Sequence, residues 1–323
     1  MSRYLWWLLS VLVFVRPWPA WAQPSPGPGI SRQLTTLRML WVQRVPLLEP
    51  THRHVRYGPD PANYVNFWKA KGTDPTPVLI QIHGGGWRGG RAMERIPANY
   101  FVDRGISVVS VEYRLMRGRE NLLPVPVHDA ARAVQFVRAH AAAWGIDPQR
   151  VALTGGSAGG CTSLWLAYHD DLADPEAADP IARQSTKPTC VVAYVPQTAI
   201  DAPLVRAWVG DEILKHPMIW QAVGAESPED VLQGYERYRE LAREFSPYYH
   251  VDANDPPVFL EAWGSVQVPA RDVGHGIHHP VLCLKLKEKC DEVGAECHVL
   301  LRAHRSDGYF SAAREFIERK LHP

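Results

Sequence analysis

Val151-Ala-Leu-Thr-Gly-Gly-Ser-Ala-Gly-Gly-Cys161 is the stretch that decides the fold. It begins with residues that favour a β-strand, and a helical run follows from Cys161 to Tyr168. The centre of the stretch has the G-x-S-x-G spacing of a sharp turn between strand and helix, with small residues that leave room for a strained backbone at Ser157. We expect this turn to hold the Ser157 hydroxyl at the end of a sheet. The Ala158 N–H would then lie at a helix N-terminus, where it stabilises a developing negative charge on oxygen.

A second glycine-rich motif lies upstream of this turn. Val78-Leu-Ile-Gln-Ile-His83 is typical of a buried strand, and Gly84-Gly85-Gly86-Trp87 follows it directly. A strand that ends in HGGG supplies backbone N–H groups to an oxyanion hole, the set of donors that binds the negative oxygen of an acyl-transfer intermediate. Two glycine-rich turns in an unrelated α/β protein are the alternative, but each motif has the flanking elements that its function requires. The residues expected to form the oxyanion hole are Gly84, Gly85, Gly86 and Ala158.

With these motifs the chain resembles the α/β-hydrolase superfamily, in particular the HGGGW esterases near the hormone-sensitive-lipase and carbohydrate-esterase relatives. Further stretches carry the resemblance from residue 50 to the C-terminus, namely Val111-Glu-Tyr-Arg114, the segment 142–151 and the segment 245–260. The resemblance implies an α/β-hydrolase fold, with a mostly parallel central sheet, flanking helices and a small lid inserted at 198–248. It also implies hydrolysis of a carboxylic ester by a serine nucleophile, with no cofactor and no metal.

Length and composition agree with one α/β domain. The chain has 323 residues, of which 46% are hydrophobic, enough to bury a large core. The formal net charge is +1 and both signs are mixed throughout, without a basic run or zinc-finger spacing. These features argue against a nucleic-acid partner.

The N-terminus has the pattern of a secretory signal peptide. Arg3 precedes an apolar run from Tyr4 to Val15, and Ala20-Trp21-Ala22 is a small-x-small cleavage site. We therefore expect a signal peptide at 1–22, a linker and N-terminal segment at 23–49 and the hydrolase domain at 50–323. The apolar run is too short to span a bilayer comfortably, so we expect a secreted or periplasmic protein without a stable membrane span after cleavage.

Hydrophobic periodicity predicts the order of the elements that follow. We expect helices at 92–103, 127–144, 227–244, 280–293 and 311–321, and a late strand at 258–263.

The resemblance breaks where the histidine and the acid of the catalytic relay should lie. In the family, the acid follows the strand at 258–263 in a His-Gly-Asp-x-Asp pattern before Val-Pro, but here Ser265 holds that position. The family's histidine follows the last strand before Gly, but here Asp307 precedes Gly308 and His304 lies three residues earlier. A Ser nucleophile needs a base, and the base needs an orienting group.

Three arrangements remain open at this point. In the first, the base and the acid have exchanged loops: Asp307 orients a histidine of the 275–279 cluster, His278 or His279, and that histidine activates Ser157. In the second, His304 is the base and Asp201 or Asp272 orients it. In the third, the relay is lost and the chain is a ligand-binding protein on a hydrolase scaffold. A metal site at the histidine cluster is less favoured, because the cluster lacks a clear carboxylate partner.

Catalysis is favoured over ligand binding because the nucleophile turn and the oxyanion motifs are intact, and the positions of the loops favour the first arrangement over the second. The sequence therefore predicts a secreted serine esterase with catalytic candidates Ser157, Asp307, His304, His278 and His279. Its expected partner is a small-molecule or carbohydrate ester, an expectation that comes from the family. Peptidase activity is a weaker alternative.

Overall fold

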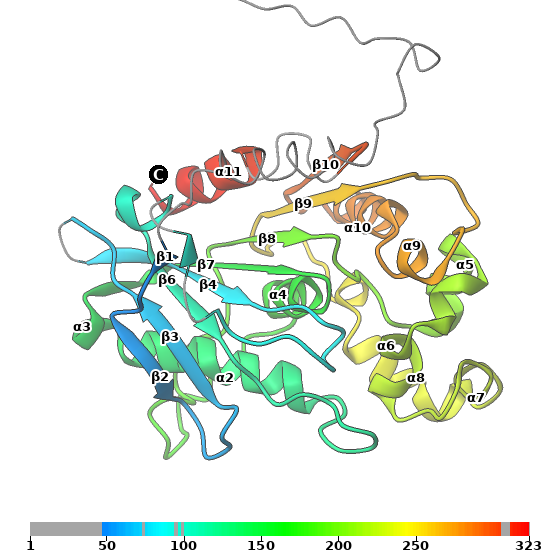
Figure 1. Ribbon diagram of the computed structural model, residues 1–323, viewed down its shortest axis with the longest axis horizontal. Coiled ribbons are helices and arrows are strands. Elements are labelled where there is room, and N and C mark those ends of the chain that lie inside the picture. The colour runs from blue at the N-terminus through cyan, green and yellow to red at the C-terminus, as the bar shows by residue number, and fades with distance from the viewer. Residues whose placement is uncertain (1–46, 73–74, 94–95, 98–99, 305–310, 323) are drawn as a thin grey trace, which may run out of the picture. The chain divides into compact units, whose positions relative to one another are not determined.

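The central element of the structure, a computed structural model, is a sheet of eight strands (Figure 1). The structure describes residues 47–72, 75–93, 96–97, 100–304 and 311–322. The strands are, in sheet order, β10 Cys297–Arg302, β9 Val258–Trp263, β8 Cys190–Tyr194, β7 Ile146–Gly156, β4 Thr76–Ile82, β6 Ser107–Val111, β3 Tyr64–Trp68 and β2 His52–Arg56. The signal peptide predicted at 1–22 and most of the segment predicted at 23–49 lie outside the described residues.

Strand direction divides the sheet into two parts. The six strands from β10 to β6 run parallel to their neighbours, whereas β3 is antiparallel to β6 and β2 is antiparallel to β3. Parallel strands are covered on both faces, and Val78, Ile80 and Ile82 of β4 are accordingly fully buried. The structure thus confirms the predicted α/β-hydrolase fold, with a mostly parallel sheet and flanking helices.

Helices cover both faces of this sheet. The helices are α2 Val125–Ala139, α3 Ala141–Trp144, α4 Ala158–Tyr168, α5 Ala202–Val209, α6 Pro217–Trp220, α7 Pro228–Gln233, α8 Tyr235–Glu244, α9 Val273–Ile277, α10 Pro280–Val293 and α11 Ser311–Leu321. Residues of α2, α4 and α10 join one core cluster, while Phe316 and Ile317 of α11 pack on the other face with Ala152 and Val192. Figure 1 shows α11 on the opposite side of the sheet from α2 and α4.

The segment between β8 and β9, where the resemblance implies a lid at 198–248, is helical. It holds α5 to α8 and three short 3-10 turns, η3 Asp211–Lys215, η4 Gln221–Val223 and η5 Pro247–Tyr249. The single helix expected at 227–244 is divided into α7 and α8 at Gly234. Its N-terminal cap is as expected, because the Ser227 side chain accepts a hydrogen bond from the Asp230 N–H.

The prediction of a helix at 92–103 is wrong. Ile96–Pro97 instead forms a short strand, β5, antiparallel to Leu47–Leu48 (β1), and among the described residues of this segment Val102–Arg104 (η2) forms a 3-10 turn. The extended backbone that pairs with β1 is incompatible with a helix through Ile96 and Pro97, and Pro97 also disfavours a helix interior.

In the described part of the chain, none of the helices has both the length and the apolar character that a membrane span needs.

Candidate active site

Ser157 lies at the sharp turn between β7 and α4. Its backbone has φ 52° and ψ −126°, a strained conformation in a residue that is not glycine. The turn passes so close to the end of β4 that a Cβ at Gly159 would lie 2.1 Å from the Ile82 carbonyl oxygen. Only glycine fits there, which explains the last position of the G-x-S-x-G pattern.

The predicted oxyanion turn lies directly beside this serine. A Cβ on Gly84 would meet the Gly156 carbonyl oxygen at 2.5 Å, so the two glycine-rich turns are in van der Waals contact. The Arg88 and Gly89 N–H groups close the turn by bonding to the Gly85 carbonyl. Within the described residues, the N–H groups of Gly85, Gly86 and Ala158 have no acceptor. These donors are therefore available to a substrate oxygen.

Two buried aromatic side chains hold the oxyanion turn in place. Trp87 is fully buried, and its Nε1–H donates to Thr162 Oγ1 of α4 at 3.0 Å. Tyr113 donates its hydroxyl to the His83 carbonyl at 2.8 Å and stacks on the His83 ring, with ring centroids 4.2 Å apart. The turn is thus fixed to the helix that begins at Ala158 and to the end of β6.

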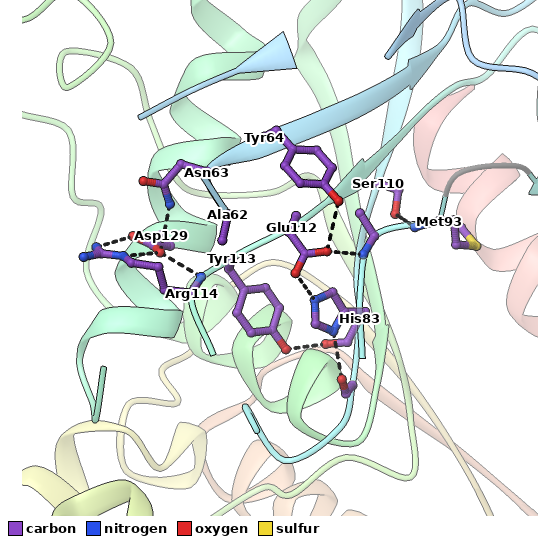
Figure 2. A network of polar contacts seen from close by, with 12 residues as sticks. Ala62, Asn63, Tyr64, His83, Met93, Ser110, Glu112, Tyr113, Arg114 and Asp129 are labelled. Atoms are coloured by element: carbon purple, nitrogen blue, oxygen red, sulfur yellow. Dashed lines mark hydrogen bonds and ion pairs between the residues drawn. The ribbon is translucent and has the colours of Figure 1, made fainter. Parts of the chain in front are cut away.

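Figure 2 shows the polar contacts behind this turn. His83 Nε2 lies 3.6 Å from Glu112 Oε1, and both side chains are buried. The other Glu112 oxygen accepts a hydrogen bond from the Ala92 N–H at 2.6 Å. Arg114 forms a bidentate pair with Asp129, whose carboxylate also accepts from Asn63 (Figure 2). Glu112 and Tyr113 therefore hold His83 at the start of the glycine-rich turn, whereas Arg114 pairs with Asp129 of α2.

His278 is the histidine that reaches the nucleophile. Its Nε2 lies 3.0 Å from Ser157 Oγ, although the two residues are 121 positions apart in the chain. The side chain is half-buried at the end of α9, and this burial lowers its pKa. A hydrogen bond with the Gly274 backbone acts in the opposite direction. The ring is therefore neutral near pH 7 and in position to accept the serine proton.

The neighbouring histidines shape the loop that carries His278. His275 Nε2 lies 2.8 Å from the Ser265 carbonyl oxygen and His279 Nε2 lies 3.1 Å from that of Gln267, so both rings bind the first part of the loop. His279 also accepts the Val281 N–H at the start of α10. The structure therefore makes His279 a capping residue and does not bring it to Ser157.

A fully buried glutamine, Gln197, was not identified from the sequence. Its Nε2 donates to the Ile277 carbonyl at 2.6 Å, and its Oε1 lies 3.4 Å from Ser157 Oγ. It connects the nucleophile to the residue before His278. The available signal was a polar residue just after β8, at the carboxyl edge of the sheet where ligands bind in this class of fold.

The remaining candidates lie elsewhere. His304 follows β10 with an exposed side chain, and among the described residues only His278 places a ring nitrogen within hydrogen-bonding distance of Ser157 Oγ. Asp201 is buried and accepts hydrogen bonds from Tyr235 and Tyr249. Asp272 caps α9 through the His275 N–H. Neither carboxylate is placed to orient His304 as the second arrangement required. Asp307 lies outside the described residues.

Comparison with known proteins identifies related chains. Probable carboxylic ester hydrolase LipM of Mycobacterium tuberculosis is 29% identical over 245 residues, which make up 74% of this chain and 53% of LipM. Esterase LipC of the same organism is 30% identical over 221 residues, or 66% of this chain and 50% of LipC. The chain thus spans about half the length of these curated relatives.

Solved structures share the fold. A truncated carbohydrate esterase from gut microbiota is 18% identical with a TM-score of 0.61, and the match covers 87% of this chain and 99% of that one. Thermogutta terrifontis esterase 2 is 23% identical with a TM-score of 0.56, over 84% of this chain and 93% of that one. The BD-FAE family model matches residues 67–264, which is more than half of the chain and contains both glycine-rich turns. The protein therefore belongs to the BD-FAE family, within the α/β-hydrolases.

Proposed function

We propose that the protein is a serine hydrolase of carboxylic esters, with Ser157 as nucleophile and His278 as general base. The observation that carries the proposal is the 3.0 Å distance between His278 Nε2 and Ser157 Oγ, at a nucleophile turn that adjoins unpaired N–H donors. The curated relatives LipM and LipC, named as a probable carboxylic ester hydrolase and an esterase, support the same activity.

In the acylation step, Ser157 Oγ attacks the acyl carbon while its proton moves to His278 Nε2. The carbonyl π bond opens, and the negative oxygen binds the N–H groups of the Gly84–Gly86 turn and of Ala158. When the intermediate collapses, the bond to the alcohol oxygen breaks and His278 returns its proton to that oxygen. The products of this step are the alcohol and an ester of Ser157.

Deacylation repeats the sequence with water. His278 takes a proton from the water, whose oxygen attacks the acyl carbon, and then returns that proton to Ser157 Oγ as the acid leaves. Each cycle consumes one ester and one water and restores the neutral histidine.

The base must present Nε2 without a proton. When the Ser157 hydroxyl donates to Nε2, the neutral ring carries its proton on Nδ1. We assign Asp307, from the loop after β10, as the acid that stabilises the charged ring during the reaction. The base and the acid would then have exchanged loops relative to related esterases.

The lid, the class of substrate and the location of the protein complete the proposal, each from a different observation. The helical segment 198–248 acts as the lid, because a Cβ on Gly86 would lie 3.3 Å from His216 and 3.8 Å from Met218 of that segment. The substrate is a small-molecule or carbohydrate ester, in keeping with the carbohydrate esterase among the solved structures. The pattern at 1–22 directs the protein to the periplasm or outside the cell.

Covalent labelling tests the proposal. The mature protein is treated with a fluorophosphonate probe and assayed with p-nitrophenyl acetate, beside Ser157→Ala and Ser163→Ala. Ser163 is a buried serine of α4 that bonds to the Gly159 carbonyl, so it controls for the loss of a hydroxyl near the site. We expect labelling and turnover to disappear with Ser157→Ala alone. A folded wild type that neither labels nor turns over would instead indicate a ligand-binding protein.

A further inference from the structure

A second histidine, His216, lies against the oxyanion turn from the lid side. It stands between η3 and α6, and its Nδ1 accepts the Met218 N–H at 3.2 Å. A neutral ring that accepts at Nδ1 carries its proton on Nε2. Among the described residues, no group accepts a hydrogen bond from that Nε2–H. His216 therefore has an N–H donor at Nε2 that none of the described residues uses.

The ring that carries this donor lies beside the Gly84–Gly86 turn. His216 Cε1, which is bonded to both ring nitrogens, lies 3.3 Å from the point that a Cβ on Gly86 would occupy. The neighbouring η3 packs tightly on α9, since a Cβ on Gly276 would lie 2.8 Å from the Ile213 nitrogen. The segments that carry His216 and His278 are thus in direct contact.

The charges around His216 favour an anion. Arg88, directly after the oxyanion turn, has an exposed guanidinium with no ion pair among the described residues. Burial, with the nearby His278 and Arg88, lowers the pKa of His216 to about 4. The carboxylates of Asp211 and Glu212 are paired with Arg206 and Lys215. Both carboxylates of η3 are therefore already paired, and Arg88 supplies an unpaired positive charge near His216.

We propose that His216 and Arg88 form a donor subsite beside the oxyanion turn that binds a carboxylate group of the ester substrate. The subsite rests on the proposed esterase function and narrows its substrate class. His216 Nε2–H donates to a carboxylate oxygen, and the Arg88 guanidinium supplies the compensating charge. The enzyme then prefers esters that carry an anionic group on their acyl or alcohol part over neutral esters of the same size.

Paired substrates test this preference. Mono-p-nitrophenyl succinate places a carboxylate on the acyl side, and 4-acetoxybenzoate places one on the alcohol side; p-nitrophenyl butyrate and phenyl acetate are the neutral counterparts. We expect Arg88→Gln and His216→Phe each to lower the anionic-to-neutral ratio of kcat/KM at least about tenfold, because each removes a hydrogen bond to a charged group. The loss should lie in KM, because the contact exists before the reaction.

Control variants separate the subsite from general effects. Arg91→Gln removes the same charge from another exposed residue of this loop and should leave the ratio unchanged. His216→Gln keeps an N–H donor and should restore part of the ratio that His216→Phe loses. Equal loss for anionic and neutral esters, or no preference in the wild type, would overturn the subsite.

Calorimetry keeps this test independent of catalysis. Ser157→Ala protein should bind 4-acetoxybenzoate more tightly than phenyl acetate, and adding Arg88→Gln should abolish the difference. Equal binding of the two esters would reject the subsite even if the wild type is inactive. Normal fluorophosphonate labelling without any anion preference would reject the subsite and leave the esterase proposal standing.

Discussion

The loops after β9 and β10 leave the same edge of the sheet, because the two strands are parallel neighbours, but they differ in what they bring to Ser157. The loop after β9 carries His278 to 3.0 Å from the nucleophile. The loop after β10 carries His304, whose side chain is exposed. The related esterases that the sequence resembles place the acid in the first of these loops and the histidine in the second.

Several hydrogen bonds hold the loop after β9 in place. The loop after β9 is tied together by hydrogen bonds from His275 and His279 to the Ser265 and Gln267 carbonyls, and Gln197 fixes it to the nucleophile. A side chain on such a rigid loop can be held within reach of Ser157. If His278 is the base, as proposed, its position follows from the bonds that hold this loop beside Ser157 and not from the order of the residues in the chain.

Removing the two histidines one at a time is the strongest test of this comparison. We expect His278→Ala to lower kcat for p-nitrophenyl acetate by about 10²- to 10⁴-fold, the usual contribution of a general base. We expect His304→Ala to change it by less than about threefold, as for other surface substitutions. Stopped-flow and steady-state assays of both variants give the comparison directly.

Thermal unfolding of both variants is the control. Both should remain folded, so that a loss of kcat reflects the histidine and not unfolding. A large loss with His304→Ala and a small one with His278→Ala would return the base to the loop after β10. Comparable losses in both variants would mean that the loops share the function.

Sequence alone identified the parts of the site that depend on local chain geometry. The strand–turn–helix around Ser157 and the turn at Gly84–Gly86 are specified by neighbouring small residues, and both were located correctly. The bounds predicted for 258–263, 280–293 and 311–321 also match β9, α10 and α11, since strong periodicity and clear caps define them.

Features that depend on distant contacts were not predictable in the same way. The sequence limited the base to His278, His279 or His304, but only the fold selects one, because the contact with Ser157 spans 121 residues. Gln197 gave no local signal beyond its place after a strand. The helix wrongly expected at 92–103 failed for the same reason, since Ile96–Pro97 pairs with the distant Leu47–Leu48.

Gln197→Ala tests whether the loop after β9 must be fixed to the nucleophile. The substitution leaves the buried Ile277 carbonyl without its donor, which costs about 1–3 kcal/mol of unfolding free energy. We also expect kcat to fall about tenfold, because His278 then loses its fixed position. Urea unfolding and kinetics measure the two effects.

Gln135→Ala is the matched control for this variant. Gln135 is another buried glutamine, and its Nε2 donates to the Leu172, Ala182 and Gln184 carbonyls away from the site. It should lose stability while kcat remains near the wild-type value. If both variants lose activity in proportion to stability, Gln197 has no separate positioning function.

Asp307→Asn measures how much the loop after β10 still contributes. We expect a loss in kcat of about tenfold, smaller than the contribution of about 10²- to 10⁴-fold made by the base itself, because Gln197 and the bonds within the loop after β9 still hold His278 in place. Asp291→Asn, which removes an exposed carboxylate of α10, controls for the change in charge. A loss as large as that of His278→Ala would make Asp307 indispensable, whereas no loss would leave Ser157 and His278 as a dyad.

The pH profile gives the smallest and most specific effect. A base must be neutral to accept the serine proton, and burial lowers the pKa of His278 below the ordinary 6.5. The acid limb of kcat/KM should therefore have its midpoint below pH 6.5, with activity lost as pH falls through it. Burial and the nearby Arg88 lower the pKa of His216 to about 4, and we expect a variant at that position to leave the midpoint of this limb in place. Removing Asp307 should move the midpoint further down, because a nearby carboxylate favours the charged ring.

A midpoint above pH 6.5 in the wild type would contradict this expectation. It would mean that a negative charge, for which the loop after β10 is the candidate, stabilises the charged ring of His278 more strongly than burial disfavours it.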